Sequence, residues 1–86
     1  MDERRRKILY RASHRGMKEA DLMIGGFVAA RISELDAPQL DRLESLLDEL
    51  DMDIMDWVIG RKPVPSQHDH DVFHMLTAFK LYDGFV

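Results

Sequence analysis

The sequence predicts an all-α fold, a compact antiparallel bundle of about five short helices, and three observations lead to it. Apolar residues recur at steps of three and four along most of the chain, the spacing of one helix face. No segment alternates apolar and polar residues as a half-buried strand would. Turn-forming stretches such as RKPVPSQ are short, and short connections between amphipathic helices favour antiparallel neighbours.

The first two helices are separated by Gly16. We expect one at roughly Glu3–Ser13 and the next at roughly Met17–Ile32, with Gly16 ending the first or turning the chain into the second. The adjacent pair Gly25-Gly26 interrupts the second helix, where each glycine costs about 1 kcal/mol relative to alanine. Close packing against another helix is the explanation that we favour for this pair.

The third helix has the clearest start. Asp36 can act as the N-cap, Pro38 suits the first turn, and Gln39 stands three residues after the cap, as in a capping box. The leucines that follow at helical spacing are Leu40, Leu43, Leu46, Leu47 and Leu50.

Two further helices complete the bundle. The fourth is expected at about Asp53–Ile59, after Asp51 and Asp53 as possible caps, and it stops at Gly60. The last is expected from about His68 or Asp69 to Tyr82, and Trp57 is assigned mainly to packing.

Length and composition indicate a single helical domain, residues 1–86. The chain has 86 residues, 45% hydrophobic and 33% charged, which is typical of a globular protein. It has no cysteine, which excludes thiolate chemistry and disulfides. No apolar run approaches the roughly 20 residues that cross a bilayer, and the basic N-terminus has no apolar segment behind it to form a signal peptide. We expect no membrane insertion.

Charge is unevenly distributed along the chain. Residues 1–31 carry eight Lys/Arg and four Asp/Glu, whereas residues 32–86 carry four and twelve. The run RRRK, Arg4 to Lys7, raises the alternative of a small nucleic-acid-binding or regulatory protein that uses its basic first helix. A solvated helix surface is the interpretation that we favour, because nucleic-acid modules are usually strongly basic with interleaved aromatics.

The sequence shows no catalytic, cofactor-binding or metal site. His70 and His74 lie one helical turn apart and could chelate a metal beside His68, but no distant ligand is evident, and the cluster is interpreted as a solvated helix end. GxSxG, P-loop and GxGxxG motifs are absent, and the carboxylates fall on polar helix sides. We therefore expect a protein that is not an enzyme.

The stretch RGMKEAD is the best candidate for a functional surface. A turn at Gly16 would project Arg15 beside the first turn of the second helix, where Glu19 also emerges. A forked donor, a carboxylate and little bulk make a corner that docks well into a crevice of another protein. The alternative is a surface ion pair between Arg15 and Glu19, worth well under 1 kcal/mol.

Two segments resemble a known family. RGMKEADLMIGGF is similar to the RGxxExD signature of the small succinate dehydrogenase assembly factors, and DMDIMDWVIG resembles their DxDLxxWL segment. The order of segments agrees along nearly the whole chain. The Gly25-Gly26 pair departs from the family, in which bulkier residues or proline often precede the phenylalanine.

The resemblance implies a function. Members of this family form a five-helix bundle, bind the flavoprotein subunit of succinate dehydrogenase, and in some cases that of fumarate reductase, and promote its covalent attachment of FAD. The implied partner-binding residues are Arg15, Gly16, Met17, Lys18, Glu19 and Asp21. Arg15 would supply forked hydrogen bonds, Gly16 a close approach and Glu19 a carboxylate. We expect a monomeric chaperone without a stably bound cofactor or nucleic acid, cytoplasmic in a bacterium or in the mitochondrial matrix of a eukaryote.

Overall fold

Five α-helices make up most of residues 1–82, the part of the chain that the computed structural model describes, with side chains up to Phe79. They are α1 (Glu3–Ser13), α2 (Lys18–Arg31), α3 (Ala37–Leu47), α4 (Asp51–Val58) and α5 (Asp71–Tyr82), with short 3-10 turns at Ile32–Glu34 and Ser66–His68. No strand occurs in this part of the chain. The predicted all-α bundle is confirmed. None of the helices described for residues 1–82 has the length and apolar character needed to cross a membrane.

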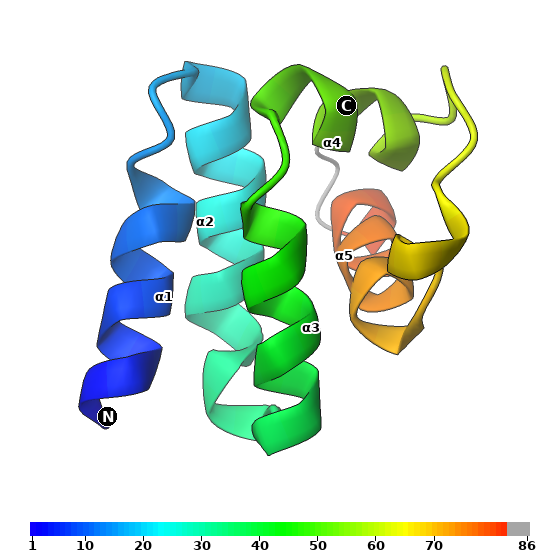
Figure 1. Cartoon of the computed structure of the whole chain (residues 1–86). Coiled ribbons are helices and arrows are strands. Elements are labelled where there is room, and N and C mark those ends of the chain that lie inside the picture. Colours follow the sequence, from blue (N-terminus) through cyan, green and yellow to red (C-terminus); the bar gives the residue numbers. More distant parts are fainter. Residues whose placement is uncertain (83–86) are drawn as a thin grey trace.

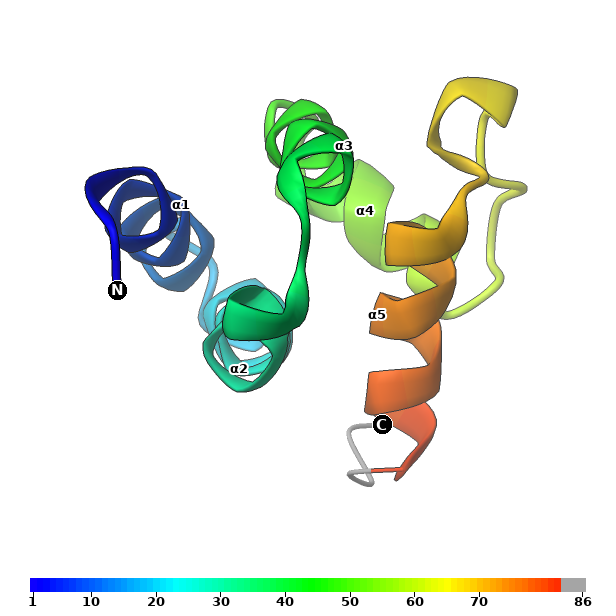
Figure 2. The ribbon, with the colours of Figure 1, turned by 90° about the horizontal axis from the view of Figure 1, so that it is seen from below.

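The first three helices run up, down and up, so that α1 and α3 are parallel to each other (Figure 1). Helix α4 lies across the end of the bundle where α2 begins, beside the turn that joins α1 to α2 (Figure 1). Helix α5 crosses the others: it is seen along its side where α1, α2 and α3 are seen nearly end-on (Figure 2). The antiparallel arrangement thus holds for α1, α2 and α3, which carry the candidate site at one end.

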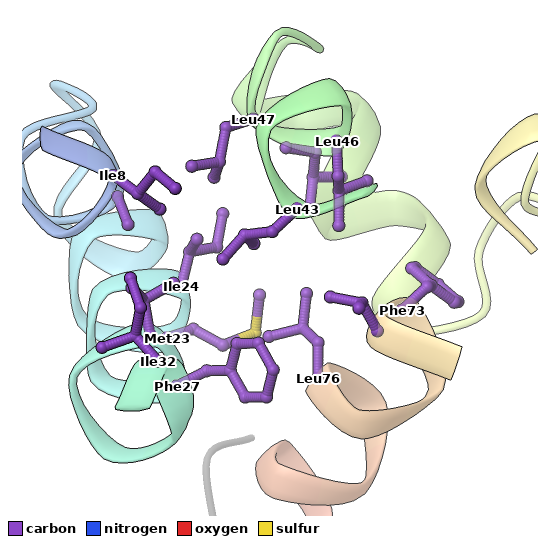
Figure 3. Close-up of a cluster of buried hydrophobic side chains, with 14 of the residues drawn as sticks. Ile8, Met23, Ile24, Phe27, Ile32, Leu43, Leu46, Leu47, Phe73 and Leu76 are labelled. Carbon is purple, nitrogen blue, oxygen red and sulfur yellow. The ribbon is translucent and has the colours of Figure 1, made fainter. Parts of the chain in front are cut away.

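The core lies where α1, α2, α3 and α5 converge (Figure 3). Its centre is the apolar face of α2, with Ile24, Phe27 and Val28 all almost completely buried. Side chains of the other helices close around it, among them Ile8, Leu43, Leu46, Leu47, Phe73 and Leu76 (Figure 3). Trp57 packs against this core from α4 and is partly buried, which confirms its predicted role in packing.

The third helix begins as predicted but ends early. Asp36 accepts a hydrogen bond from the Gln39 amide, and the Gln39 side chain accepts one from the Asp36 amide, each at 3.0 Å, so the capping box is confirmed. The helix stops at Leu47, and Leu50, which was predicted to continue the apolar stripe, is 72% exposed. Spacing misled here because a residue at the correct interval belongs to a helix only while the backbone stays helical.

The boundaries of the last two helices also differ from the prediction. Helix α4 begins at Asp51, and neither Asp51 nor Asp53 caps it, since the N-cap is Leu50 and has no side-chain hydrogen bond. It ends before Gly60, which has a left-handed φ of 82° and confirms the predicted stop. Helix α5 begins at Asp71 rather than at His68 or Asp69, because a 3-10 turn at Ser66–His68 precedes it.

The two adjacent glycines of α2 have different surroundings. A Cβ on Gly25 would lie 2.9 Å from Ser13 Oγ and 3.0 Å from Ser13 Cα, so α1 approaches the backbone of α2 at this point. A Cβ on Gly26 would meet only the Phe79 ring, at an ordinary 3.8 Å. Close helix packing, the predicted explanation, is therefore confirmed for Gly25, whereas crowding does not require glycine at 26.

Candidate partner-binding site

The turn between α1 and α2 is built around Gly16. Its φ is 95°, in the left-handed region that residues with a side chain seldom adopt. Nothing lies within 4 Å of the position that a Cβ would occupy, and the residue is exposed. Glycine is thus required by the backbone conformation rather than by internal space, and the surface at this point is a bare backbone.

The Arg15 side chain points into the protein. Its guanidinium donates from Nε to the Asp51 carboxylate, from Nη1 to the Leu47 carbonyl at 2.9 Å, and from Nη2 to the Glu49 carbonyl at 2.6 Å. Only 10% of the side chain is exposed. The prediction that Arg15 projects outward as a free forked donor is therefore wrong. The predicted alternative is wrong as well, because the carboxylate paired with Arg15 is that of Asp51 and not that of Glu19.

The three acceptors of Arg15 lie at a junction of two helices. Leu47 is the last residue of α3, where helical carbonyls lack partners within the helix and a cation is favoured by the helix dipole, and Glu49 lies two residues beyond it. Asp51 opens α4, where an anion is favoured. One guanidinium therefore ties the C-terminal end of α3 to the N-terminal end of α4, and both to the α1–α2 turn.

Asp21 fixes the same turn from the other side. Its Oδ1 accepts a hydrogen bond from the Arg15 backbone amide at 2.6 Å, and it is partly buried in the first turn of α2. Met17, the residue before α2, is partly buried against the core. Two of the six predicted site residues, Arg15 and Asp21, thus hydrogen-bond within the chain and shape the turn.

Gly16, Lys18 and Glu19 form the solvent-facing part of the predicted site, and we call these three residues the elbow. Lys18 and Glu19 lie in the first turn of α2, at the positive end of the helix dipole, and no side chain caps this end. Across the Arg15 hydrogen bonds, Leu50 and Met52 on either side of Asp51 are exposed by 72% and 54%. The elbow is therefore a polar corner beside apolar surface.

Sequence reasoning missed the partners of Arg15. Asp51 was considered only as a possible helix cap, and the two carbonyls carry no sequence signal. The one available hint was the resemblance of both RGMKEAD and DMDIMDW to segments of the same family, because two motifs of one family often meet in space.

Only part of the histidine cluster is solvated, since His74 is exposed and His68 is not. His68 is 1% exposed, and its Nε2 lies 2.6 Å from the Glu49 carboxylate, so that part of the prediction is wrong. His70 Nδ1 accepts from the Phe73 amide at 3.1 Å, and burial lowers the pKa of this ring. His74 pairs instead with Asp69 at 2.7 Å. Within the described residues, no group of three or more histidine, aspartate or glutamate side chains could hold a metal ion.

The basic first helix meets acidic residues of α3. Arg4 binds Asp41 at 2.5 Å and Glu44 at 2.7 Å, and one heptad further Arg11 binds Asp48 at 2.7 Å. This register fits the parallel course of α1 and α3. These surface ion pairs also place acidic side chains of α3 beside the basic residues of α1, so the structure does not favour the nucleic-acid-binding alternative.

A hollow of about 290 Å³ lies at the other end of α2, lined by Arg31, Glu34, Met75, Ala78 and Phe79. Its only charged pair, Arg31 and Glu34, is a surface ion pair at 3.6 Å with both side chains about half exposed. This arrangement offers no nucleophile and no pair of acid and base in unlike environments. The elbow remains the best candidate site.

The described residues thus define a class: a small all-α protein whose candidate site is a hydrogen-bonded surface turn suited to another macromolecule rather than a catalytic cleft. Residues 6–80 match the family described as "Flavinator of succinate dehydrogenase", and the chain belongs to this family. It is 42% identical over 64 residues to a protein of Acetobacter pasteurianus named FAD assembly factor SdhE, covering 74% of this chain and 59% of that protein.

Two eukaryotic relatives are also similar. The mitochondrial succinate dehydrogenase assembly factor 2 of Dictyostelium discoideum is 33% identical over 76 residues, covering 88% of this chain and 54% of that protein. Assembly factor 2-A of Drosophila mojavensis is 33% identical over 78 residues, covering 88% and 50%. The chain therefore spans between half and three-fifths of the length of these relatives. The predicted family is confirmed.

Proposed function

We propose that this protein is an assembly factor that binds the flavoprotein subunit of succinate dehydrogenase and promotes the covalent attachment of FAD to that subunit. Membership of the family described as the flavinator of succinate dehydrogenase is the observation that carries the proposal. The elbow supports it, because Gly16, Lys18 and Glu19 are exposed and stand on a turn fixed by Arg15 and Asp21.

The proposed role is that of a chaperone and not of an enzyme. Binding to the elbow would favour a conformation of the flavoprotein in which the flavin and its acceptor histidine are close to attack geometry, and the bond would then form by the flavoprotein's own chemistry. Under this proposal the protein acts as a monomer and holds no cofactor of its own. The flavoprotein of fumarate reductase is a second client in the same proposal, and the compartment is the bacterial cytoplasm or the mitochondrial matrix.

The roles within the elbow differ from those predicted from sequence. Gly16 would let the backbone of the client approach closely, and Glu19 would accept hydrogen bonds from it. Lys18 adds a cation at the uncapped N-terminal end of α2, and Met17 contributes its partly exposed edge. Arg15 and Asp21 would act by holding the turn rather than by touching the client.

Co-expression tests the proposal. The apo flavoprotein subunit is produced with this protein or with a variant, and covalent flavin is read as in-gel fluorescence. We expect the wild type to raise the signal, and Glu19→Ala and Gly16→Arg to reduce it. Glu34→Ala is the matched control, because Glu34 is an exposed carboxylate at the far end of α2. A signal that does not depend on the protein would contradict the proposal.

A further inference from the structure

We propose that Asp51, which lies outside the predicted site, is a positioning residue for client binding and acts on the elbow through Arg15. The inference rests on the proposed function and names a residue on which that function depends. It starts from a contact between segments 36 residues apart in the chain, the pairing of Arg15 Nε with the Asp51 carboxylate.

Few contacts hold the turn that carries the elbow. Besides the helices that flank it and the packing of Met17 against the core, the turn is fixed by the Arg15 amide bonded to Asp21 at 2.6 Å and by the Arg15 side chain bonded to residues 47, 49 and 51. No atom lies within 4 Å of the position that a Cβ on Gly16 would occupy, and α2 begins without a side-chain cap. The orientation of the Arg15 side chain is therefore a main constraint on the turn.

Asp51 supplies the negative charge that this orientation needs. The Arg15 side chain is 10% exposed and its other two acceptors are neutral carbonyls, so without Asp51 a largely buried guanidinium would lack a counter-ion. A charge left in this way is strongly unfavourable, and the side chain would move toward water. The turn would then lose its connection to the α3–α4 junction.

Asp51 itself offers little surface to a partner. Its side chain is 17% exposed, and the oxygen that pairs with Arg15 is already occupied. Any effect of Asp51 on the client must therefore pass through the turn. A turn that is ordered before binding spares the complex the entropy of ordering it, which is the advantage of preorganisation.

A double-mutant cycle tests the inference. The affinity of the purified apo flavoprotein subunit is measured for Arg15→Ala, Asp51→Ala and the double variant, below the unfolding temperature of each. We expect each single change to weaken binding about tenfold or more. The double variant should bind as tightly as the single variant with the lower affinity, because both changes remove the same constraint. Glu19→Ala should weaken binding by the same factor in the wild type and in Asp51→Ala.

Two further variants keep the test decisive. Asp51→Asn preserves the size of the side chain and one acceptor oxygen, and its affinity for the client should lie between those of the wild type and Asp51→Ala. If the alanine variant folds poorly, Asp51→Asn still tests the role of the charge. Asp48→Ala removes a carboxylate that pairs with Arg11 at 2.7 Å on the same side of the bundle, and it should bind as the wild type does.

Each outcome bears on the inference. It is overturned if Asp51→Ala and Asp51→Asn bind normally while Glu19→Ala does not, or if Arg15→Ala weakens binding as much in the Asp51→Ala background as in the wild type. In both cases the proposed function stands. If Glu19→Ala, Gly16→Arg and all Asp51 variants bind normally, the proposed docking site fails together with the inference.

Discussion

Arg15 and Asp51 form a largely buried ion pair that joins the α1–α2 turn to the junction of α3 and α4, and two main-chain carbonyls share the same guanidinium. The arginine of the RGxxExD signature thus binds its own chain here. The exposed residues of the signature, Gly16 and Glu19, follow it directly in the chain, at the turn and in the first turn of α2. This relationship leads to expectations about stability as well as binding.

Arg15→Ala should lower the free energy of unfolding by about 3 kcal/mol, because it leaves Asp51 and two carbonyls without their donor in a mostly buried place. That is a large part of the roughly 5–10 kcal/mol expected for a small domain. Urea unfolding followed by helical circular dichroism measures it. Arg11→Ala, which breaks an exposed ion pair, is the control and should cost well under 1 kcal/mol. Equal losses for the two variants would contradict the buried role of Arg15.

Gly16→Ala should cost about 1–2 kcal/mol, because the left-handed φ of 95° strains any residue with a Cβ. No steric contact adds to this cost, since the Cβ position is open. The loss should therefore be similar for Gly16→Ala and Gly16→Ser when both are unfolded thermally. A much larger loss for serine would mean that the site is crowded, against the structure.

The two glycines of α2 should respond in opposite directions. Gly25→Ala should destabilise by roughly 1 kcal/mol, because overpacking against the Ser13 backbone costs more than the helix propensity that alanine restores. Gly26→Ala should stabilise by up to about 1 kcal/mol, because its Cβ would make an ordinary contact with Phe79. Each kcal/mol shifts the melting temperature of a domain of this size by about 4–8 °C. A change in melting temperature of the same sign for both variants would contradict the close approach of α1 to α2 at Gly25.

Stability should decrease as the pH falls below about 6.5, in part through His70. Burial lowers its pKa below the ordinary 6.5, and the charges of His68 and Arg42 add to this shift while Asp71 opposes it. Between the lowered pKa and 6.5 the unfolded chain binds more protons than the folded one, so acid favours unfolding there. His70→Asn retains an acceptor for the Phe73 amide, which the structure requires.

The measurement for His70 is the difference in melting temperature between pH 7.5 and pH 5. This difference should be smaller in His70→Asn than in the wild type. His74→Asn is the control, because His74 is exposed and pairs only at the surface. An unchanged difference in His70→Asn would show that His70 does not take part in the pH dependence.

The sequence predicted best what local interactions determine. The start of α3 followed from Asp36 and Gln39, which are three residues apart, and the turn followed from Gly16. The sequence predicted the turn at Arg15 correctly, but it predicted an outward-pointing side chain. The side chain points inward because its acceptors lie 32 to 36 residues further along the chain. Periodicity alone could not show this long-range pairing.

The prediction for His68 was wrong for a related reason. The predicted helix was extended back to His68 by spacing, whereas the chain forms a 3-10 turn there and buries His68 against Glu49. The role of Glu49 as the partner of His68 depends on how two segments 19 residues apart fold together. A buried histidine and its carboxylate resemble a surface pair until the tertiary structure is known.

The most direct test of the central claim, that the elbow contacts the flavoprotein, is amide hydrogen exchange of this protein alone and in complex with the apo flavoprotein subunit. The first turn of α2 has no side-chain cap, so its amides should exchange readily in the free protein. We expect residues 16–20 to become protected in the complex, while the Ile32–Glu34 turn at the other end of α2 is unchanged. Protection confined to other segments, with residues 16–20 exchanging as before, would contradict the account.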